Sequence, residues 1–204
     1  MSAPPKTVLE VSADEVRAIR AAVRAADPGS LAPGRAIAGP EHVDGLLELL
    51  SDPRVSDPIY DLPRPFTREN IAAWVAQGLA ERAAGEGLLM VSLDEAGHVA
   101  GYSKVTIWPD RSAAELGGAM RADLQNTGRG GEGMARSFGW IFATLGVRMM
   151  CLTAALDNIR VQKGIDRAGF VRMGERDAVR SDGSIRRSVY WEITAEQWAA
   201  RYAP

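Results

Sequence analysis

The chain has little of what disulfide, metal and membrane sites need. Its 204 residues include one cysteine, Cys151, and only two histidines, His42 and His98. One cysteine cannot form an internal disulfide, so a reducing cytoplasm is the expected compartment. Without a cluster of histidine and cysteine we expect no metal site. No apolar run approaches the roughly 20 residues that a membrane span requires, and the N-terminus lacks the basic and then apolar order of a secretory signal.

A strong charge of either sign is also missing. The chain carries 24 Lys and Arg against 26 Asp and Glu, a formal net charge of -2, which gives no electrostatic case for nucleic acid. Apolar residues make up 46% and charged residues 25%, values that are typical of a soluble globular protein with a core of its own. We therefore expect neither nucleic acid nor a membrane as a partner, and both a monomer and a homodimer remain open.

Residues 1–34 predict an N-terminal extension with one helix. Residues 1–11 show no periodic pattern, and we expect them to be frayed. Ser12 followed by Glu15 has the spacing of a capping box. The helix that it begins carries a stripe of apolar residues, which are Val16, Ile19 and Val23, and should end near Asp27-Pro28-Gly29. The pattern divides the chain into this extension and a domain of residues 35–204.

From Arg35 the chain alternates strand and helix patterns. The expected strands are residues 35–38, 88–93, 98–108, 113–120, 147–154, 170–179 and 185–193. The expected helices are residues 41–50, one capped by Thr67, one behind a glycine loop, a short one capped by Asp157 or Asn158 that stops at Gly169, and one after Thr194. The proline-rich stretch 52–66 reads as an extended loop. Tight turns predict antiparallel pairs and a helical crossover predicts a parallel pair, so the fold class is α/β with a mixed sheet flanked by helices.

The segment Gln125 to Met134, QNTGRGGEGM, is the clearest indication of a binding site. Its four glycines within six residues leave backbone N–H groups accessible. Apolar residues at helical spacing follow, and these are Met134, Phe138, Ile141, Phe142 and Leu145. A glycine loop therefore leads into the N-terminus of a helix, where unpaired N–H groups and the helix dipole favour a phosphate.

Three kinds of phosphate ligand are alternative interpretations of this loop. The run Gly128 to Gly133 fits the dinucleotide fingerprint G-x-G-x-x-G, but that fingerprint follows a strand directly and here the polar connector 121–127 intervenes. A nucleotide P-loop needs Lys and then Ser or Thr after the glycines, and neither is present. The third ligand is the pyrophosphate of coenzyme A.

Two motifs in order resemble those of the GNAT N-acetyltransferases, in particular the branch with the ribosomal-protein N-terminal acetyltransferases. Gln125-x-x-Gly128-x-Gly130 is similar to the acyl-CoA loop of that family. Residues 152–170 resemble its second motif, with an Asn cap, a short helix and a Gly-Phe ending. Residues 62–66 and the hairpin 182–192 are also similar to this branch. The resemblance covers roughly residues 35–194, and it implies a central sheet in which two parallel strands splay apart around the acyl arm.

The resemblance implies an N-acetyltransferase that uses acetyl-CoA as co-substrate and no metal. A primary amine, either a small molecule or a protein N-terminus, would attack the thioester directly. The residues expected to hold coenzyme A are Gln125, Asn126, Thr127, Gly128, Arg129, Gly130, Gly131, Asn158, Arg160 and Lys163. The acceptor pocket is expected between the proline loop near Tyr60 to Phe66, the helix after it and the final hairpin.

Glu115 is the expected general base, because it is the only ionisable residue on the strand that the resemblance places beside the thioester. A structural hydrogen bond or salt bridge is the alternative role. Ile165 and Val161 stand where relatives often have Tyr and Ser as the general acid. Tyr190, Ser137 or a water are then the candidates for that role, and we select Tyr190. The loss of both usual acids leaves a catalytically silent acyl-CoA-binding or interaction domain as the alternative function.

Overall fold

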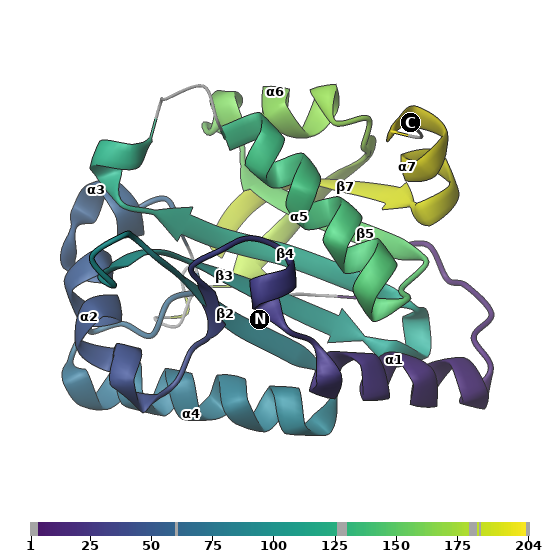
Figure 1. The fold of residues 1–204 in the computed structure, drawn as a ribbon. Coiled ribbons are helices and arrows are strands. Elements are labelled where there is room, and N and C mark those ends of the chain that lie inside the picture. The colour runs from purple at the N-terminus through teal and green to yellow at the C-terminus, as the bar shows by residue number, and fades with distance from the viewer. Residues whose placement is uncertain (1–3, 60, 126–129, 180–182, 184, 203–204) are drawn as a thin grey trace.

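A computed structural model of the chain describes residues 4–59, 61–125, 130–179, 183 and 185–202 (Figure 1). The described residues form one mixed sheet with the strand order β1-β2-β3-β4-β5-β7-β6. The strands are β1 (Arg35–Ile37), β2 (Gly87–Leu93), β3 (Val99–Trp108), β4 (Ala113–Met120), β5 (Met149–Ala155), β6 (Val171–Val179) and β7 (Ile185–Thr194). Strands β4 and β5 are parallel, and every other neighbouring pair is antiparallel, which confirms the predicted mixed sheet.

Helices lie on both faces of this sheet (Figure 1). They are α1 (Ala13–Ala25), α2 (Val43–Ser51), α3 (Pro53–Ser56), α4 (Arg68–Ala84), α5 (Gly130–Leu145), α6 (Ile159–Arg167) and α7 (Ala195–Tyr202). No helix in the described ranges is both long enough and apolar enough to cross a bilayer.

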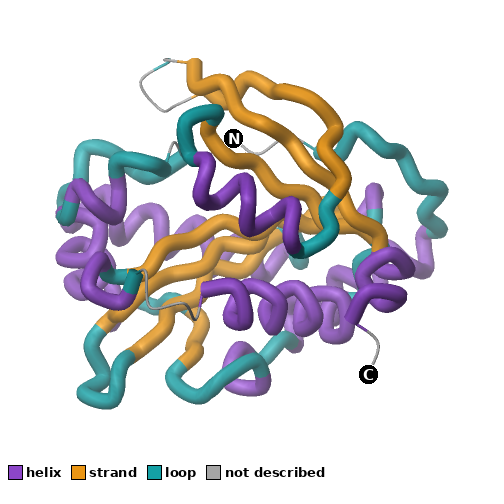
Figure 2. The backbone as a smooth tube through the Cα atoms, turned by 90° about the horizontal axis from the view of Figure 1, so that it is seen from above, coloured by secondary structure: helices purple, strands orange, loops and turns teal. Residues whose placement is uncertain are grey.

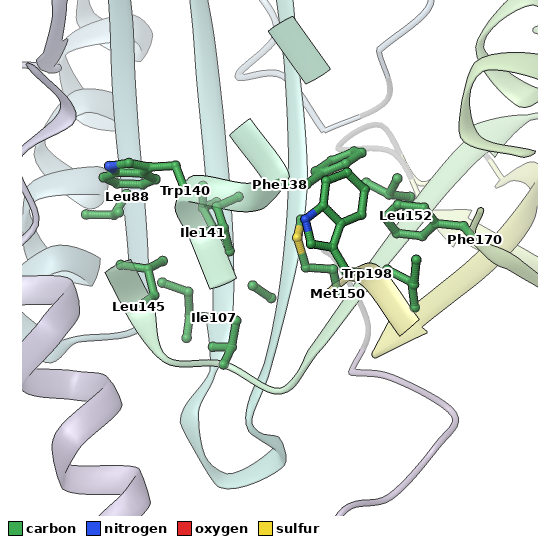
Figure 3. Close-up of a cluster of buried hydrophobic side chains, with 14 of the residues drawn as sticks. Leu88, Ile107, Phe138, Trp140, Ile141, Leu145, Met150, Leu152, Phe170 and Trp198 are labelled. Atoms are coloured by element: carbon green, nitrogen blue, oxygen red, sulfur yellow. The ribbon is translucent and has the colours of Figure 1, made fainter. Parts of the chain in front are cut away.

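The larger core lies between the sheet and α5. Phe138 of α5 is buried against Phe170 and Trp198, with ring centroids 5.1 Å and 5.5 Å away (Figure 3). The sheet contributes Met150 and Leu152, whose side chains point toward α5 because alternate residues of a strand face the same side. A second core on the opposite face packs α2 and α4 against β2 and β3. The two cores therefore identify the two faces of the sheet, and each functional side chain lies on one of them.

Local sequence signals set most helix ends. Ser12 accepts a hydrogen bond from the backbone of Glu15 and begins α1, and Thr67 begins α4 in the same way, as predicted. Asn158 caps α6, which ends before Gly169 at a positive φ of 91°. The prediction of an extended loop over residues 52–66 was wrong at its start. Asp52 caps the short helix α3, because a proline at the first helical position loses no hydrogen bond there.

The N-terminal extension is part of the packed molecule. Ile19 and Val23 of α1 are buried in the larger core, and Arg148 forms an ion pair with Glu15 at 2.7 Å. The expectation that residues 1–11 are frayed was wrong for the described part of that stretch. Lys6 and Thr7 donate hydrogen bonds to Glu192 on β7, a partner 185 residues away that no local pattern could indicate.

Candidate functional site

Strands β4 and β5 run side by side only at their beginnings. In the described chain their pairing is confined to Ala113 with Met149, Ala114 with Met150 and Glu115 with Cys151. Beyond these pairs β4 continues to Met120 and β5 continues to Ala155. Seen from above, the two groups of strands diverge toward one end (Figure 2). The sheet is therefore splayed at β4 and β5, as the resemblance implied, and β4 presents an exposed edge where a ligand can pair with its backbone.

Glu115 sits at the last paired position before the splay. Its side chain is buried, and the Thr153 hydroxyl donates a hydrogen bond of 3.0 Å to Glu115 Oε1. The register places Cys151 opposite Glu115, Glu192 opposite Cys151 and Tyr190 opposite Thr153. Because paired residues share a face, these five side chains lie on one face, away from α5. We call it the Glu115 face.

Cys151 is a buried residue of β5. Its thiol is fully buried and lies 3.6 Å from the carbonyl oxygen of Ala114. Burial raises the pKa of Cys151, and the negative charge of Glu115 raises it further. The thiol therefore stays protonated at neutral pH and is a poor nucleophile.

Tyr190 and Glu192 form a buried hydrogen-bonded pair. The Tyr190 hydroxyl donates to Glu192 Oε1 at 2.7 Å, and both side chains are almost inaccessible to solvent. Burial raises the pKa of Tyr190 above its ordinary value, so the residue is a neutral phenol. Burial also acts to raise the pKa of Glu192, but hydrogen bonds from Thr7 and Tyr190 outweigh it, and the pKa is lowered. Tyr190 thus directs its proton to a carboxylate that remains charged.

The described parts of both predicted motifs lie at the open end of the splay. Helices α5 and α6 follow the carboxyl ends of β4 and β5, so their N-termini lie at the same end of the sheet (Figure 1). Gly130 and Gly131 are the first residues of α5. The Gln125 amide donates to the Met120 carbonyl at 3.0 Å, while Asn126, Thr127, Gly128 and Arg129 lie outside the described residues. Two helix dipoles thereby favour an anion at this end.

One predicted residue of the second motif caps a helix, and the other two lie on the surface. The Asn158 side chain accepts from the Val161 backbone N–H at 3.3 Å, so it holds the first turn of α6. Arg160 and Lys163 lie exposed on the same helix. Exposed apolar side chains flank the splay on both sides. They are Met120 at the end of β4, Leu124 after it, and Leu156 and Ile159 after β5. The open end therefore combines apolar surface with positive charge.

Two adjacent glycines of β4 differ in the space that a side chain would have. A Cβ at Gly118 would lie 2.5 Å from the Tyr102 carbonyl oxygen, so the packing of β4 against β3 requires a glycine there. A Cβ at Gly117 would meet no atom within 4 Å. Gly117 lies two residues beyond Glu115 and shares its face. The space beside it fits a ligand that lies along the exposed edge.

The elements predicted to form an acceptor pocket come together in part. Arg186 of the hairpin donates to the Pro58 carbonyl at 2.9 Å, and Arg64 donates to the Ser56 carbonyl at 2.9 Å. The segment between α3 and α4 therefore contacts the hairpin, while Tyr60 lies outside the described residues. Sequence reasoning missed Thr153 and Glu192 as site residues. The alternation of side chains along β5 and β7 shows which residues of each strand share a face. Only the register of the three strands shows that these residues lie beside Glu115 of β4.

The comparisons with known proteins agree with this geometry. A family model described as an acetyltransferase (GNAT) domain matches residues 35–171. Ribosomal-protein-S5-alanine acetyltransferase from Vibrio fischeri aligns with a TM-score of 0.68 at 14% identity, over 80% of this chain and 93% of that one. Mycobacterium smegmatis RimJ in complex with CoA-disulfide aligns with a TM-score of 0.68 at 16% identity, over 80% and 82%. A GNAT acetyltransferase from Streptococcus pneumoniae aligns with a TM-score of 0.58 at 16% identity, over 78% and 98%. No curated protein matches the chain.

Proposed function

The chain belongs to the GNAT acetyltransferase family, and from that premise we propose that it transfers an acetyl group from acetyl-CoA to a primary amine by direct attack. The observation that carries the proposal is the splay of β4 and β5, with Glu115 at its apex and two helix N-termini at its open end. Such an arrangement has room for an acyl arm, donors for phosphate and a carboxylate beside the reacting atoms. The dinucleotide alternative loses support, because a 3-10 turn, Ala122–Leu124, separates β4 from the glycine loop.

The residues at hand fit coenzyme A at the open end. We propose that the N-terminus of α5, with Gly130 and Gly131, binds the pyrophosphate together with residues 125–129. Lys163 and Arg160 would add positive charge from α6, and Asn158 would hold the first turn of that helix in place. The exposed apolar residues at the two strand ends suit the pantetheine arm. Bound acetyl-CoA supplies an activated thioester.

The residues at the apex would then accept and donate the protons of the reaction. We propose that Glu115 accepts the proton that the amine nitrogen loses as the N–C bond forms. The C–S bond breaks in the same exchange, and the thiolate takes a proton from Tyr190 or from a water. Tyr190 can do so only when its hydrogen bond to Glu192 is released. A lysine-like amine with a pKa near 10.4 is neutral in only about one molecule in 2500 at pH 7, so the base matters more for it than for an α-amine, which is neutral in about one in seven.

The acceptor that we propose is a protein N-terminus or a small-molecule amine. One structural neighbour is described as a ribosomal-protein-S5-alanine acetyltransferase, which supports the protein N-terminus as the first candidate. The cytoplasm stays the expected compartment, since the single cysteine is free and buried.

Thiol release from acetyl-CoA tests this function. The acceptor panel should contain peptides with a free α-amine, the same peptides blocked at the N-terminus but bearing a lysine, and polyamines. We expect acceptor-dependent release with at least one class, and coenzyme A binding by calorimetry. NAD serves as the control ligand. Tight binding of NAD without binding of coenzyme A would overturn the proposal.

A further inference from the structure

Residues 4–7, which we call the N-terminal strap, lie across β7 and β6 on the Glu115 face. In Figure 1 the segment that precedes α1 passes behind the sheet. The backbone N–H groups of Lys6 and Thr7 both donate to Glu192 Oε1, at 2.6 Å and 3.2 Å, and the Thr7 hydroxyl donates to Oε2. The carbonyl of Pro4 accepts from Arg176 at 3.0 Å. Backbone and side chains together thus hold the strap on the sheet.

The strap brings a primary ammonium group onto this face. Lys6 Nζ donates to the carbonyl oxygen of Met173 at 2.6 Å and lies 5.6 Å from the centroid of the Tyr190 ring. Arg176 lies 4.2 Å from the same ring. Tyr190 is fully buried beneath these two cations. The amine of the strap therefore lies over β7 and β6 on the Glu115 face.

The strap lies on the same face of the sheet as Glu115. Tyr190 pairs with Thr153 across β7 and β5, and Thr153 bonds directly to Glu115. The strap contacts on β7 are thus separated from the proposed base on β4 by one intervening strand, β5. An extended polypeptide acceptor would offer this face the same groups that the strap offers it, namely backbone N–H groups and an amine.

We propose that the N-terminal strap is an intramolecular competitor of the amine acceptor. It occupies part of the acceptor surface through Glu192, and it must detach before a polypeptide acceptor can bind there. This inference rests on the proposed function. Detachment is feasible, because the strap is short and a few hydrogen bonds hold it, and Glu192 would then be solvated by water. A strap attached for 90–99% of the time would weaken apparent acceptor affinity by about 10- to 100-fold.

The test compares the full-length protein with a Lys6→Ala/Thr7→Pro variant. The proline removes the N–H and the hydroxyl of residue 7, and the alanine removes the ammonium. We expect kcat/KM for an α-amino peptide to rise about tenfold or more through a lower KM. The Kd of acetyl-CoA, measured by calorimetry, should not change. Val8→Ala is the matched control, since Val8 lies in the same segment and is 68% exposed.

Hydrogen exchange measures detachment of the strap independently of acetyl transfer. The amide of Thr7 should be protected in the wild type and should exchange faster when the peptide acceptor is added. Unchanged or lower kcat/KM in the variant, with acetyl transfer intact in both proteins, would overturn the competition alone. No acetyl transfer by either protein would overturn the proposed function, and the competition with it.

Discussion

Thr153 Oγ1 donates a hydrogen bond of 3.0 Å to Glu115 Oε1 at the point where β4 and β5 cease to pair. A hydroxyl donor orients a carboxylate without forming an ion pair with it. The pair therefore has the properties of a base that a neighbouring residue positions. Its location depends on the parallel register of two strands that are separated in sequence by α5.

Glu115→Gln should lower kcat by about 10² to 10⁴ and leave the Kd of acetyl-CoA nearly unchanged. The amide keeps the shape of the side chain but cannot take a proton from the amine. The acidic limb of the pH–rate profile should disappear in this variant. Steady-state kinetics with the best acceptor of the panel, together with calorimetry, would measure both effects.

Thr153→Val is the matched control for that variant. It removes the hydroxyl that orients Glu115 but keeps the carboxylate, so kcat should fall by a smaller factor while the acidic limb persists. A Glu115→Gln enzyme with wild-type kcat and an unchanged pH profile would mean that Glu115 is structural. The amine would then lose its proton to bulk water, which is credible for an α-amine.

Gly117→Val should weaken acetyl-CoA binding without loss of stability. The new side chain meets no protein atom within 4 Å of its Cβ, and valine favours a strand, so only a ligand along the edge of β4 would be displaced. Gly118→Val is the contrasting variant, because its Cβ would lie 2.5 Å from the Tyr102 carbonyl oxygen. Calorimetry and thermal melting should show a lost ligand in the first variant and a lower Tm in the second. Normal affinity in Gly117→Val would place the acyl arm elsewhere.

Much of the fold could be predicted because its signals are local. The capping serine and threonine, Ser12 and Thr67, act on N–H groups three residues away, and the turn at residues 94–97 joins strands that are adjacent in the chain. Helix α3 was not predicted, because a proline-rich stretch usually indicates a loop, whereas Pro53 stands at the first helical position, which tolerates proline. Signals of short range are readable, but they must be weighed by position.

The contacts that build the candidate site could not be predicted, because they are non-local. Thr153 reaches Glu115 only through the register of β4 and β5, and Glu192 reaches Thr7 across almost the whole chain. Residues 4–7 show no periodicity, so no local pattern predicts that they are ordered. The glycine loop was predicted from its composition and the helical pattern that follows it, and Asn126 to Arg129 stay a prediction.

Phe138→Ala should cost about 3–5 kcal/mol of unfolding free energy, because the cavity would lie in the centre of the larger core. The ring is 1% exposed and contacts Phe170 and Trp198, which come from other elements and cannot all move to fill the space. Ile185→Ala is the control, since Ile185 is 61% exposed and the change should fall within about 0.5 kcal/mol. Urea unfolding would measure both values. Similar losses for the two variants would contradict the assigned core.

The stabilising effect of Glu192 should depend on pH. Hydrogen bonds from Thr7 and Tyr190 hold its pKa below the value in the unfolded chain, despite burial. A carboxylate with a lowered folded-state pKa contributes stability above its unfolded pKa of about 4.3, and that contribution is lost as pH falls through the folded-state pKa. Glu192→Gln should therefore be less stable than the wild type at pH 7, and the difference should shrink below about pH 4.

Two neighbours of Glu192 cannot mimic this effect. Burial raises the pKa values of Tyr190 and Cys151, so both stay protonated throughout the acidic range. Carboxylates elsewhere are the same in both proteins, so their contributions cancel in the difference. Urea unfolding of the wild type and Glu192→Gln between pH 7 and pH 3 would measure the gap. A gap that is constant with pH would mean that the charge of Glu192 contributes nothing, and that Thr7 and Tyr190 bond equally well to an amide.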